Sequence, residues 1–408
     1  MNNRGSSIIT LAVLFTVMIT MIATFINITK NQVTKAEINS LSVLWGKAIL
    51  SEYDINLYND YGIMAYFGNE NDISGKLNKY CSYTFKNRGS IDYEGVSCDL
   101  SEYRLIVPEN FMGTAQKSIL SDNNKKTFRE EKNGTNIIIK NKAIIETLPS
   151  INVVNENNYK VLKDLLLGGT DFNDITDGCI ELAYITKYFN NHLYVKGKKD
   201  CVFDNEWEYI LNGSMDDNEN YEKAKLKIWL LRNALNLSYL YKDAEKRQLT
   251  LTIAETICPG PWCVATQFLI MESWAVMETE WDIKTLLKGE KVPIIKTKDT
   301  WNTDIDSVLR SDAFMEKLTD EEKDNMKYLE DNYENEKKTD FGGLDYEEYL
   351  MMYIALMNDD IRLFRMMDLI QINMKYRYYN DFNFKEYNNG LTFFIKANGN
   401  VYEKEITY

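Results

Sequence analysis

The apolar segment from Ile8 to Ile28 constrains this chain more than any other feature of its sequence. No charged residue lies between Arg4 and Lys30. As an α-helix the segment would be about 31 Å long, which matches a hydrocarbon core of about 30 Å. Its threonine hydroxyls can bond to carbonyls of their own helix, so they cost little in lipid. We therefore predict a membrane-spanning helix.

A cleaved signal peptide is the alternative interpretation of this segment. The apolar run is longer than the core of an ordinary signal peptide, and no small-x-small cleavage site follows it. The sequence beyond it continues a helical pattern, in which Leu41, Leu44, Ala48 and Ile49 recur at helical spacing. A membrane helix that runs unbroken into an amphipathic stalk is the interpretation we prefer.

We expect three parts along the chain. Residues 1–30 form a short cytoplasmic tail and the transmembrane helix, residues 31–62 the stalk helix, and residues 63–408 a globular domain outside the cell. Flanking charge decides little about orientation, because Arg4 on one side is balanced by Lys30 on the other. The outward orientation depends instead on the cysteines and on the family resemblance described below.

The charge balance limits the partners of the globular part. Lys and Arg total 47 against 61 Asp and Glu, for a formal charge of −14. An acidic surface repels phosphate backbones, and no block of basic residues offers a footprint, so we expect no nucleic-acid binding. The 27 tyrosines suit both core edges and contact surfaces.

Six cysteines fall into three couples that are close in sequence. In an oxidising compartment we predict Cys81–Cys98, Cys179–Cys201 and Cys258–Cys263 disulfides. Six reduced, buried thiols are the alternative, as expected in a strictly anaerobic host.

Periodicity predicts an α+β fold that is mainly helical, with small antiparallel sheet elements near residues 90–107 and 391–408. Asn398-Gly399 between two alternating runs is a strong hairpin signal. Pro259 and Pro261 in CPGPWC force a turn. The alternation in 81–107 suggests two short strands, and residues 121–135 form an exposed loop. The charged stretch 319–340 is a solvated helix or an insertion. We expect helices over residues 219–249, 264–288, 345–357 and 361–374.

The motifs of common enzymes and metal sites are absent from the sequence. His192 is the sole histidine, which excludes HExxH zinc sites and leaves no evident triad. There is no GxGxxG, Walker or GxSxG motif. We therefore predict no catalytic residues, no metal, no cofactor and no small-molecule ligand, and we interpret His192 as a solvent-facing or capping residue.

Two polar helix sites remain. Glu278 and Asp282 are four residues apart and share a helix face with Trp274. Such carboxylates can tune one another for acid–base work or bind a cation. The alternative, which we favour, is that they bond to Arg or to backbone at a helix junction. Arg365 and Asp368 at i, i+3 are interpreted as a helix ion pair.

The order of several motifs resembles a family of bacterial single-pass membrane proteins. RGSSIITLAVLF, SEYDINLYNDYGIMAY and NEWEYILNG come first, followed by SWAVMETEWDIKTLLKGEKVPIIKT, LDYEEYLMMYIALM and RLFRMMDLIQINM. The chain is identified as a member of DUF5702, which is related in layout to TadE/TadG-like proteins of Tad (tight adherence) pilus clusters.

The resemblance implies a membrane-anchored protein that works with other Tad pilus or pseudopilin proteins. The leader is similar to a pseudopilin N-terminus that a prepilin peptidase would cut between Gly5 and Ser6. Thr10 departs from that pattern, because mature pilins carry a glutamate five residues after the cut.

Three hypotheses about function follow. The first is a non-enzymatic accessory or minor-pilin-like component of a Tad-type pilus or secretion system. The second is a surface-displayed, adhesin-like module that binds proteins through a Tyr-rich acidic face. The third and weakest is an extracytoplasmic enzyme that uses Glu278 and Asp282.

Overall fold

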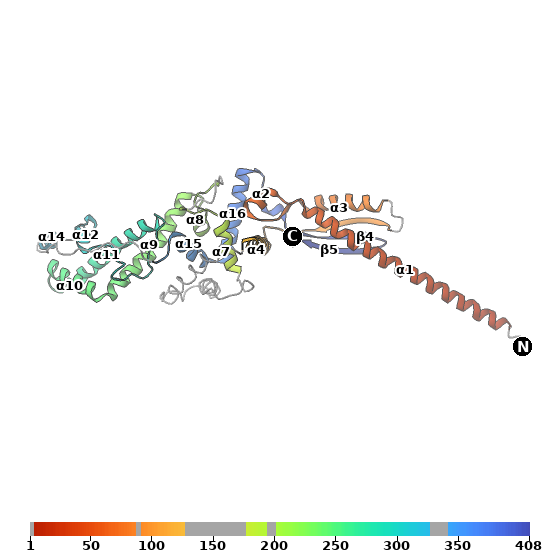
Figure 1. The fold of residues 1–408 in the computed structure, drawn as a ribbon, viewed down its shortest axis with the longest axis horizontal. Coiled ribbons are helices and arrows are strands. Elements are labelled where there is room, and N and C mark those ends of the chain that lie inside the picture. Colours follow the sequence, from red (N-terminus) through yellow and green to blue (C-terminus); the bar gives the residue numbers. More distant parts are fainter. Residues whose placement is uncertain (1–3, 87–90, 127–176, 194–200, 327–341) are drawn as a thin grey trace. The chain divides into compact units, whose positions relative to one another are not determined.

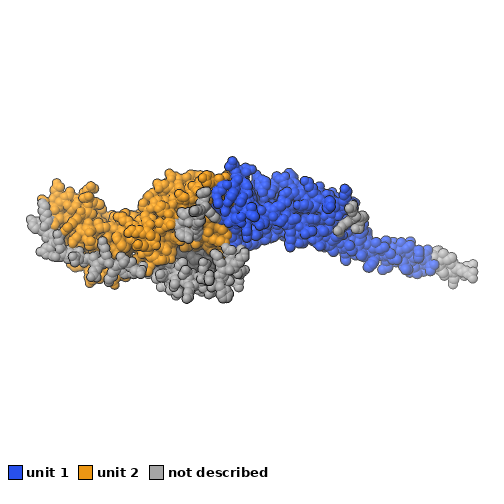
Figure 2. Space-filling model, turned by 45° about the horizontal axis from the view of Figure 1, so that its top comes forward, with its two compact units in different colours: residues 1–118, 377–408 blue, residues 119–376 orange. Residues whose placement is uncertain are grey.

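The structure is a computed structural model that describes residues 4–86, 91–126, 177–193, 201–326 and 342–408. For residues 4–9, 120–126 and 177–179 it describes the backbone alone. The chain divides into two compact units, coloured separately in Figure 2. Unit 1 comprises residues 1–118 and 377–408, and unit 2 comprises residues 119–376. The sequence had predicted a single globular domain over residues 63–408. In the structure the C-terminal strands belong to the same unit as the N-terminal helix, and the residues between them form the other unit.

Unit 1 is built on the helix α1, Arg4–Leu50, which is 47 residues long and therefore spans about 70 Å. Its N-terminal apolar window has none of its residues buried inside the protein. From Thr34 onward one face is buried, through Ile38, Trp45 and Ile49. Leu44, predicted for the buried face, is instead 64% exposed, because the covered stripe runs one residue away from it.

A three-stranded antiparallel sheet covers this half of α1 (Figure 1). Its order is β2 (Tyr93–Asp99), β4 (Gly390–Ala397) and β5 (Asn400–Thr407). The predicted hairpin is confirmed, since Asn398 and Gly399 connect β4 to β5 with φ of 53° and 70°. Two positive φ values in succession are those of a type I′ turn.

The core of unit 1 lies between this sheet and two helices. α1 packs on β5, and α3 (Glu70–Phe85) packs on β2. The central strand β4 alternates, so that Leu391, Phe393 and Ile395 point into the core. α1 approaches the sheet closely at Gly46, where a Cβ would lie 2.2 Å from Ile406 Cδ1. A glycine there lets α1 lie directly on β5.

Short elements complete unit 1. The predicted stalk to residue 62 breaks after Leu50, because Asp54 accepts hydrogen bonds from the Asn56 and Leu57 amides and begins a new helix. That helix ends at Gly62, whose φ is 66°. The remaining elements are α2 (Ile55–Tyr61), β1 (Tyr66–Phe67), the first part of α4 (Pro108–Lys126), a 3₁₀ turn (Phe384–Glu386) and β3 (Tyr387–Asn388), which pairs with β1. The residues of α4 from Ile119 onward belong to unit 2.

Unit 2 is helical in its described residues. One group of packed helices consists of α9 (Asp217–Lys242), α10 (Ala244–Ile257) and α11 (Cys263–Leu286). The helix predicted over 219–249 is two helices, because Asp243 adopts an extended conformation and caps α10 through the Lys246 amide. The CPGPWC turn between α10 and α11 is confirmed. Three short helices follow: α12 (Ile305–Leu309), α13 (Asp312–Met315) and α14 (Asp320–Asn325).

A second group in unit 2 contains α7 (Asp177–Tyr188), α8 (Glu206–Asn212), α15 (Tyr346–Ala355) and α16 (Asp359–Arg377). α15 packs on both α7 and α8. Tyrosines fill much of this interior, because Tyr184, Tyr346 and Tyr349 are completely or almost completely buried. Many of the tyrosines therefore serve the core instead of a contact surface.

The expected fold class is confirmed, while several boundaries are corrected. The region 81–107 contains one strand instead of two, because residues up to Phe85 belong to α3 and two turns follow β2. The loop expected over 121–135 begins as helix, up to Lys126. The rest of that loop, and most of the charged stretch after α14, lie outside the described residues.

Candidate functional site

Glu278 and Asp282 meet on one face of α11, as their spacing predicts. Both side chains are completely buried. Trp274, one turn earlier on α11, is buried beside them and donates its indole N–H to Thr303. A buried carboxylate is costly unless it is paired and hydrogen-bonded, so the contacts of each one determine what this site is.

Glu278 is saturated with hydrogen-bond donors. Its Oε1 accepts from Lys296 Nζ at 2.5 Å and from the Asn302 amide at 3.1 Å. Its Oε2 accepts from the Thr303 amide at 2.9 Å and from the Thr303 hydroxyl at 2.8 Å. Backbone amides from the segment before α12 therefore fix this carboxylate in place.

Asp282 has two unlike oxygens. Oδ2 accepts from Arg232 Nε at 3.0 Å, Arg232 Nη2 at 2.7 Å and Asn236 Nδ2 at 2.9 Å. Oδ1 lies 2.7 Å from Lys296 Nζ. Within the described part of the chain, however, Oδ1 accepts no hydrogen bond, so the ammonium lies close to it without pointing a proton at it.

Arg232 anchors this cluster from α9. Its Nη1 donates to the Pro293 and Ile294 carbonyls at 2.8 and 2.9 Å and to the Tyr349 hydroxyl at 3.3 Å. Burial alone would lower the pKa of Arg232, but Tyr349 and Asp282 beside it hold that pKa above its usual value. Two cations and two anions thus form a dry, neutral cluster, which we call the charge cluster: Arg232, Glu278, Asp282 and Lys296.

Lys246 lies beside the charge cluster and was not singled out by the sequence. Its Nζ lies 4.2 Å from the centre of the Trp274 ring and 4.9 Å from that of Trp301. Burial lowers the pKa of Lys246 to about 8. The sequence gives no local signal for this lysine beside two tryptophans. Trp301 lies 55 positions after Lys246, and only the fold brings the two residues together.

The contacts of the charge cluster are those of the alternative we favoured from the sequence, in which both carboxylates bond to Arg or to backbone. No solvent reaches the four side chains, so a diffusing substrate would have to open the helix packing to touch them. The arrangement can hold charge rigidly and bring an amine against a carboxyl group. It offers no exposed acid or base to an external substrate.

The predicted ion pair of Arg365 and Asp368 is not a direct contact in the described part of the chain, where the guanidinium binds a carbonyl group. Arg365 extends over Gly213 and donates to the Ile210 carbonyl at 2.7 Å. Burial raises the pKa of Asp368, and the nearby Tyr209 and Arg365 act in the opposite direction. The Ile210 carbonyl lies in the last turn of α8, where a helix leaves its carbonyls without an intrahelical partner, and the guanidinium supplies a donor there.

The predicted Cys81–Cys98 disulfide is not formed, and both are buried thiols. Cys98 Sγ lies 3.1 Å from the Glu70 carbonyl and 3.2 Å from Ser74 Oγ. Ser74 and Cys81 are separated by two turns of α3, about 10 Å, which is beyond the span of a disulfide. Burial raises the pKa of the Cys81 thiol to about 12.

The other predicted disulfides differ in their outcome. Cys258 and Cys263 are free thiols, so the predicted Cys258–Cys263 disulfide is not formed. Cys258 is the C-cap of α10, where its backbone N–H donates to the Ala254 carbonyl, and Cys263 begins α11. The Cys179 side chain lies outside the described residues, so the predicted Cys179–Cys201 pair does too.

His192 is exposed, in agreement with the sequence interpretation. Its ring stacks on Tyr221 at 3.8 Å, and Nδ1 lies 3.0 Å from Asn205 Oδ1. Its backbone N–H donates to Glu208, whose pKa burial raises. Among the described residues, no three His, Cys, Asp or Glu side chains gather as metal ligands.

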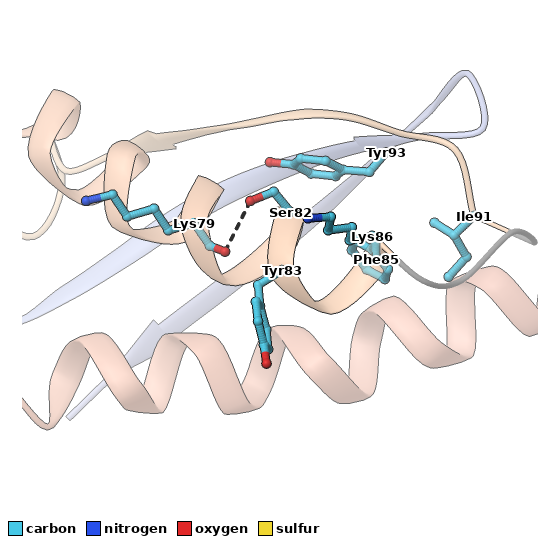
Figure 3. Close-up of a pocket in the computed structure, with 7 residues that line it drawn as sticks. All are labelled: Lys79, Ser82, Tyr83, Phe85, Lys86, Ile91 and Tyr93. Carbon is cyan, nitrogen blue, oxygen red and sulfur yellow. Dashed lines mark hydrogen bonds between the residues drawn. The ribbon is translucent and has the colours of Figure 1, made fainter.

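Unit 1 has surface hollows along α3. One is lined by residues of α3 and of the start of β2, and Figure 3 shows Tyr83 projecting from α3 toward α1. A second is lined by Leu44 and Trp45 of α1 and by Tyr80 and Tyr83 of α3. Apolar and aromatic groups dominate both, and they hold no paired acid and base.

The anchor is the remaining predicted site. Within the described ranges, α1 is the one helix that is long and apolar enough to cross a membrane. Its threonines bond backward as expected, for example from Thr16 Oγ1 to the Ala12 carbonyl at 2.7 Å. Gly5 and Ser6 lie in the first turn of α1.

Comparison with known proteins then places the chain. Residues 130–399 match the family of unknown function DUF5702. The chain belongs to DUF5702. The match begins after α1 and extends through β4, so it includes the charge cluster and leaves the anchor outside. No curated protein and no solved structure matches the chain.

Proposed function

We propose that this DUF5702 protein is a membrane-anchored, non-enzymatic component of a Tad-type pilus or secretion system, either an accessory factor or a minor-pilin-like subunit. Both units would lie outside the cytoplasm, with the N-terminus on the cytoplasmic side. The association with Tad systems comes from the family resemblance in the order of sequence motifs.

The observation that carries the proposal is the use of α1. Its first half is apolar and uncovered by the described residues, while one face of its second half is buried, in part under an antiparallel sheet. A subunit built in this way leaves an apolar helix for lipid or for neighbouring helices and displays a folded unit beyond it. That is the organisation expected of a pilin-like subunit.

The charge cluster supports the non-enzymatic part of the proposal. Its carboxylates are fully buried and satisfied by Arg232, Lys296 and backbone amides. General acid–base catalysis needs groups within hydrogen-bond reach of a substrate. The structure of the cluster instead suits a rigid core.

Gene deletion tests the role in piliation. Surface pili are counted in the deletion strain and in strains complemented with the full chain or with a chain lacking residues 8–28. We expect loss of pili that the full chain alone restores. Normal piliation and adherence after deletion would contradict the proposal.

Cysteine labelling tests the orientation. The native Cys81 and Cys98 are buried, whereas Cys201, Cys258 and Cys263 are partly exposed, so each reporter is placed in a chain whose six native cysteines are replaced by Ser. Met215→Cys in unit 2 and Val401→Cys in unit 1 replace residues that are 73% and 58% exposed. Both reporters should react with a membrane-impermeant maleimide on intact cells. Reaction that appears after cell lysis alone would place the units in the cytoplasm.

A further inference from the structure

Three reactive groups meet in the charge cluster, out of reach of bulk solvent. They are the Lys296 amine and the carboxyl groups of Asp282 and Glu278, all completely buried. Lys296 Nζ is 2.7 Å from Asp282 Oδ1 and 2.5 Å from Glu278 Oε1. Amide formation requires an amine beside a carboxyl group, and the second carboxyl group here can carry the protons.

We infer that Lys296 and Asp282 join in an intramolecular amide bond, with Glu278 as the proton carrier. This inference does not depend on the proposed function, since it concerns the chemistry of the core of unit 2 alone.

The two carboxyl groups differ in a way that assigns their roles. Asp282 Oδ2 is held by Arg232 and Asn236, which would stabilise an oxyanion developing on that oxygen. Asp282 Oδ1 accepts no hydrogen bond among the described residues, so it is the oxygen that can leave. Both oxygens of Glu278 are engaged by several donors, and Glu278 is therefore the carrier.

The geometry favours attack by nitrogen. Because a carbon–oxygen bond is about 1.2 Å long, Asp282 Cγ lies no more than about 4 Å from Lys296 Nζ. The Nζ–Oδ1 contact of 2.7 Å is not in the direction of a hydrogen bond. A group held so close to its target reacts with an effective concentration of about 10⁵ M or more.

The atoms and charges balance without a co-reactant. The Lys296 ammonium passes one proton through Glu278 to Asp282 Oδ1, which leaves a neutral amine and a neutral carboxyl group. Nζ attacks Cγ, the second proton moves by way of Glu278 to Oδ1, and the Cγ–Oδ1 bond breaks. One water is released, Glu278 is again a carboxylate, and Nζ keeps one proton in the amide.

Burial supplies the driving force for this step. Two opposite charges in a dry core carry a desolvation cost that a neutral amide does not. After the reaction Arg232 and Glu278 remain as one cation and one anion, so the cluster stays neutral. The new bond ties the last turns of α11 to the extended segment that follows Gly289.

Peptide mass spectrometry of the full-length protein, purified in detergent, tests this directly. The unfolded chain is digested with trypsin, which can cut after Lys284, Lys288 and Lys291 between the two residues. We expect the peptide that contains Asp282 to be joined to the one that contains Lys296, with a mass equal to their sum less one water. Separate peptides of unmodified mass would overturn the inference.

Variants separate the roles. Lys296→Arg keeps the positive charge and should abolish the joined peptide, and Glu278→Gln should reduce it at least tenfold. Asp282→Asn should still join, with loss of ammonia in place of water. Lys291→Arg is the matched control, because Lys291 pairs with Asp345 and Glu348 at the surface, and it should leave the joined peptide unchanged.

Two further outcomes would contradict the assignment. Fragment ions that place the bond on Glu278 would reverse the two carboxyl roles. Loss of ammonia from the wild-type chain would mean that an amide such as Asn302 is the acceptor. Circular dichroism of each variant checks that helicity is retained, and the wild-type result decides the question even where a variant fails to fold.

Discussion

The helices α1 and α11 use their residues in opposite ways. α1 exposes the apolar side chains of its first half, such as Phe15 at 66% and Ile22 at 55%. α11 buries Glu278 and Asp282 completely. A rule that places apolar residues inside and charged residues outside would get both helices wrong.

The difference lies in where the partner of each helix comes from. For the first half of α1 no partner belongs to the described chain, and its length matches a bilayer. The partners of α11 are Arg232 and Lys296, which lie outside that helix on either side in the sequence. Burial in this protein therefore follows the available partner more closely than the character of the residue.

The largest expected effect comes from placing charge on the exposed side of the comparison. Replacing both Met18 and Ile22 with Arg costs about 3 kcal/mol per residue near the centre of a membrane span. We expect most of the chain to leave the membrane fraction after an alkaline wash. Val33→Arg with Ala36→Arg, two exposed positions beyond the span, is the matched control. Retention of the Met18/Ile22 variant at the control level would refute the anchor.

The next effect comes from removing charge from the buried side. Arg232→Ala leaves Asp282 Oδ2 and the Pro293 and Ile294 carbonyls short of donors, and we expect a loss of about 3–5 kcal/mol in the free energy of unfolding. Denaturant titration followed by tryptophan fluorescence measures it. Lys298→Ala, which removes an exposed pair with Glu245, should change little. Equal losses in both variants would mean that the buried charge cluster stabilises the fold no more than an exposed ion pair does.

Lys246 sharpens the comparison through pH. Its pKa is lowered by burial from 10.5 to about 8, so the unfolded chain binds more protons than the folded chain between these values. The contribution of Lys246 to stability therefore rises with pH across that window. Near neutral pH the free energy of unfolding of Lys246→Met, measured by denaturant titration, should exceed that of the wild type by up to about 3 kcal/mol. This difference should disappear at the upper end of the pH window. A gap that does not change with pH would contradict a charged, buried Lys246.

The smallest expected effect tests the covered half of α1. Gly46→Val would push against Ile406, at a cost of about 1–3 kcal/mol. Ile406→Ala in the same chain should recover part of that loss. Gly75→Val in α3 is the control, because a side chain there meets open space. If both valine variants unfold at the same denaturant concentration, α1 does not lie on β5 as described.

Local sequence signals were sufficient for the turns and for most helices. Asn398-Gly399 predicted its hairpin because positive φ is a property of those two residues. The signal for the long apolar helix was equally local, since an uninterrupted apolar run defines it. The helix break at Asp243 was missed, because the apolar pattern continues across it and the capping signal is a single residue.

Features that depend on distant residues could not be predicted in this way. β2 pairs with β4, whose residues lie about 300 positions further along the chain, and nothing near Cys98 announces that pairing. The position of Cys98 on β2, away from Cys81, depends on this long-range pairing. For the charge cluster a partial signal existed, because Arg232 and Asn236 fall at i+4 steps on the stripe of Ile228 and Leu240. Polar residues on an apolar stripe indicate a buried network, although they do not name the partner.

The separation of α1 from its covering strands has a consequence for biosynthesis. α1 emerges from the ribosome first, and residues 51–389 must follow before β4 and β5 exist. Until then Trp45 and Ile49 have no sheet to cover them. Unit 2 can therefore fold while unit 1 is still open, and closure of β5 onto α1 is a late step that a chaperone or a neighbouring protein could intercept.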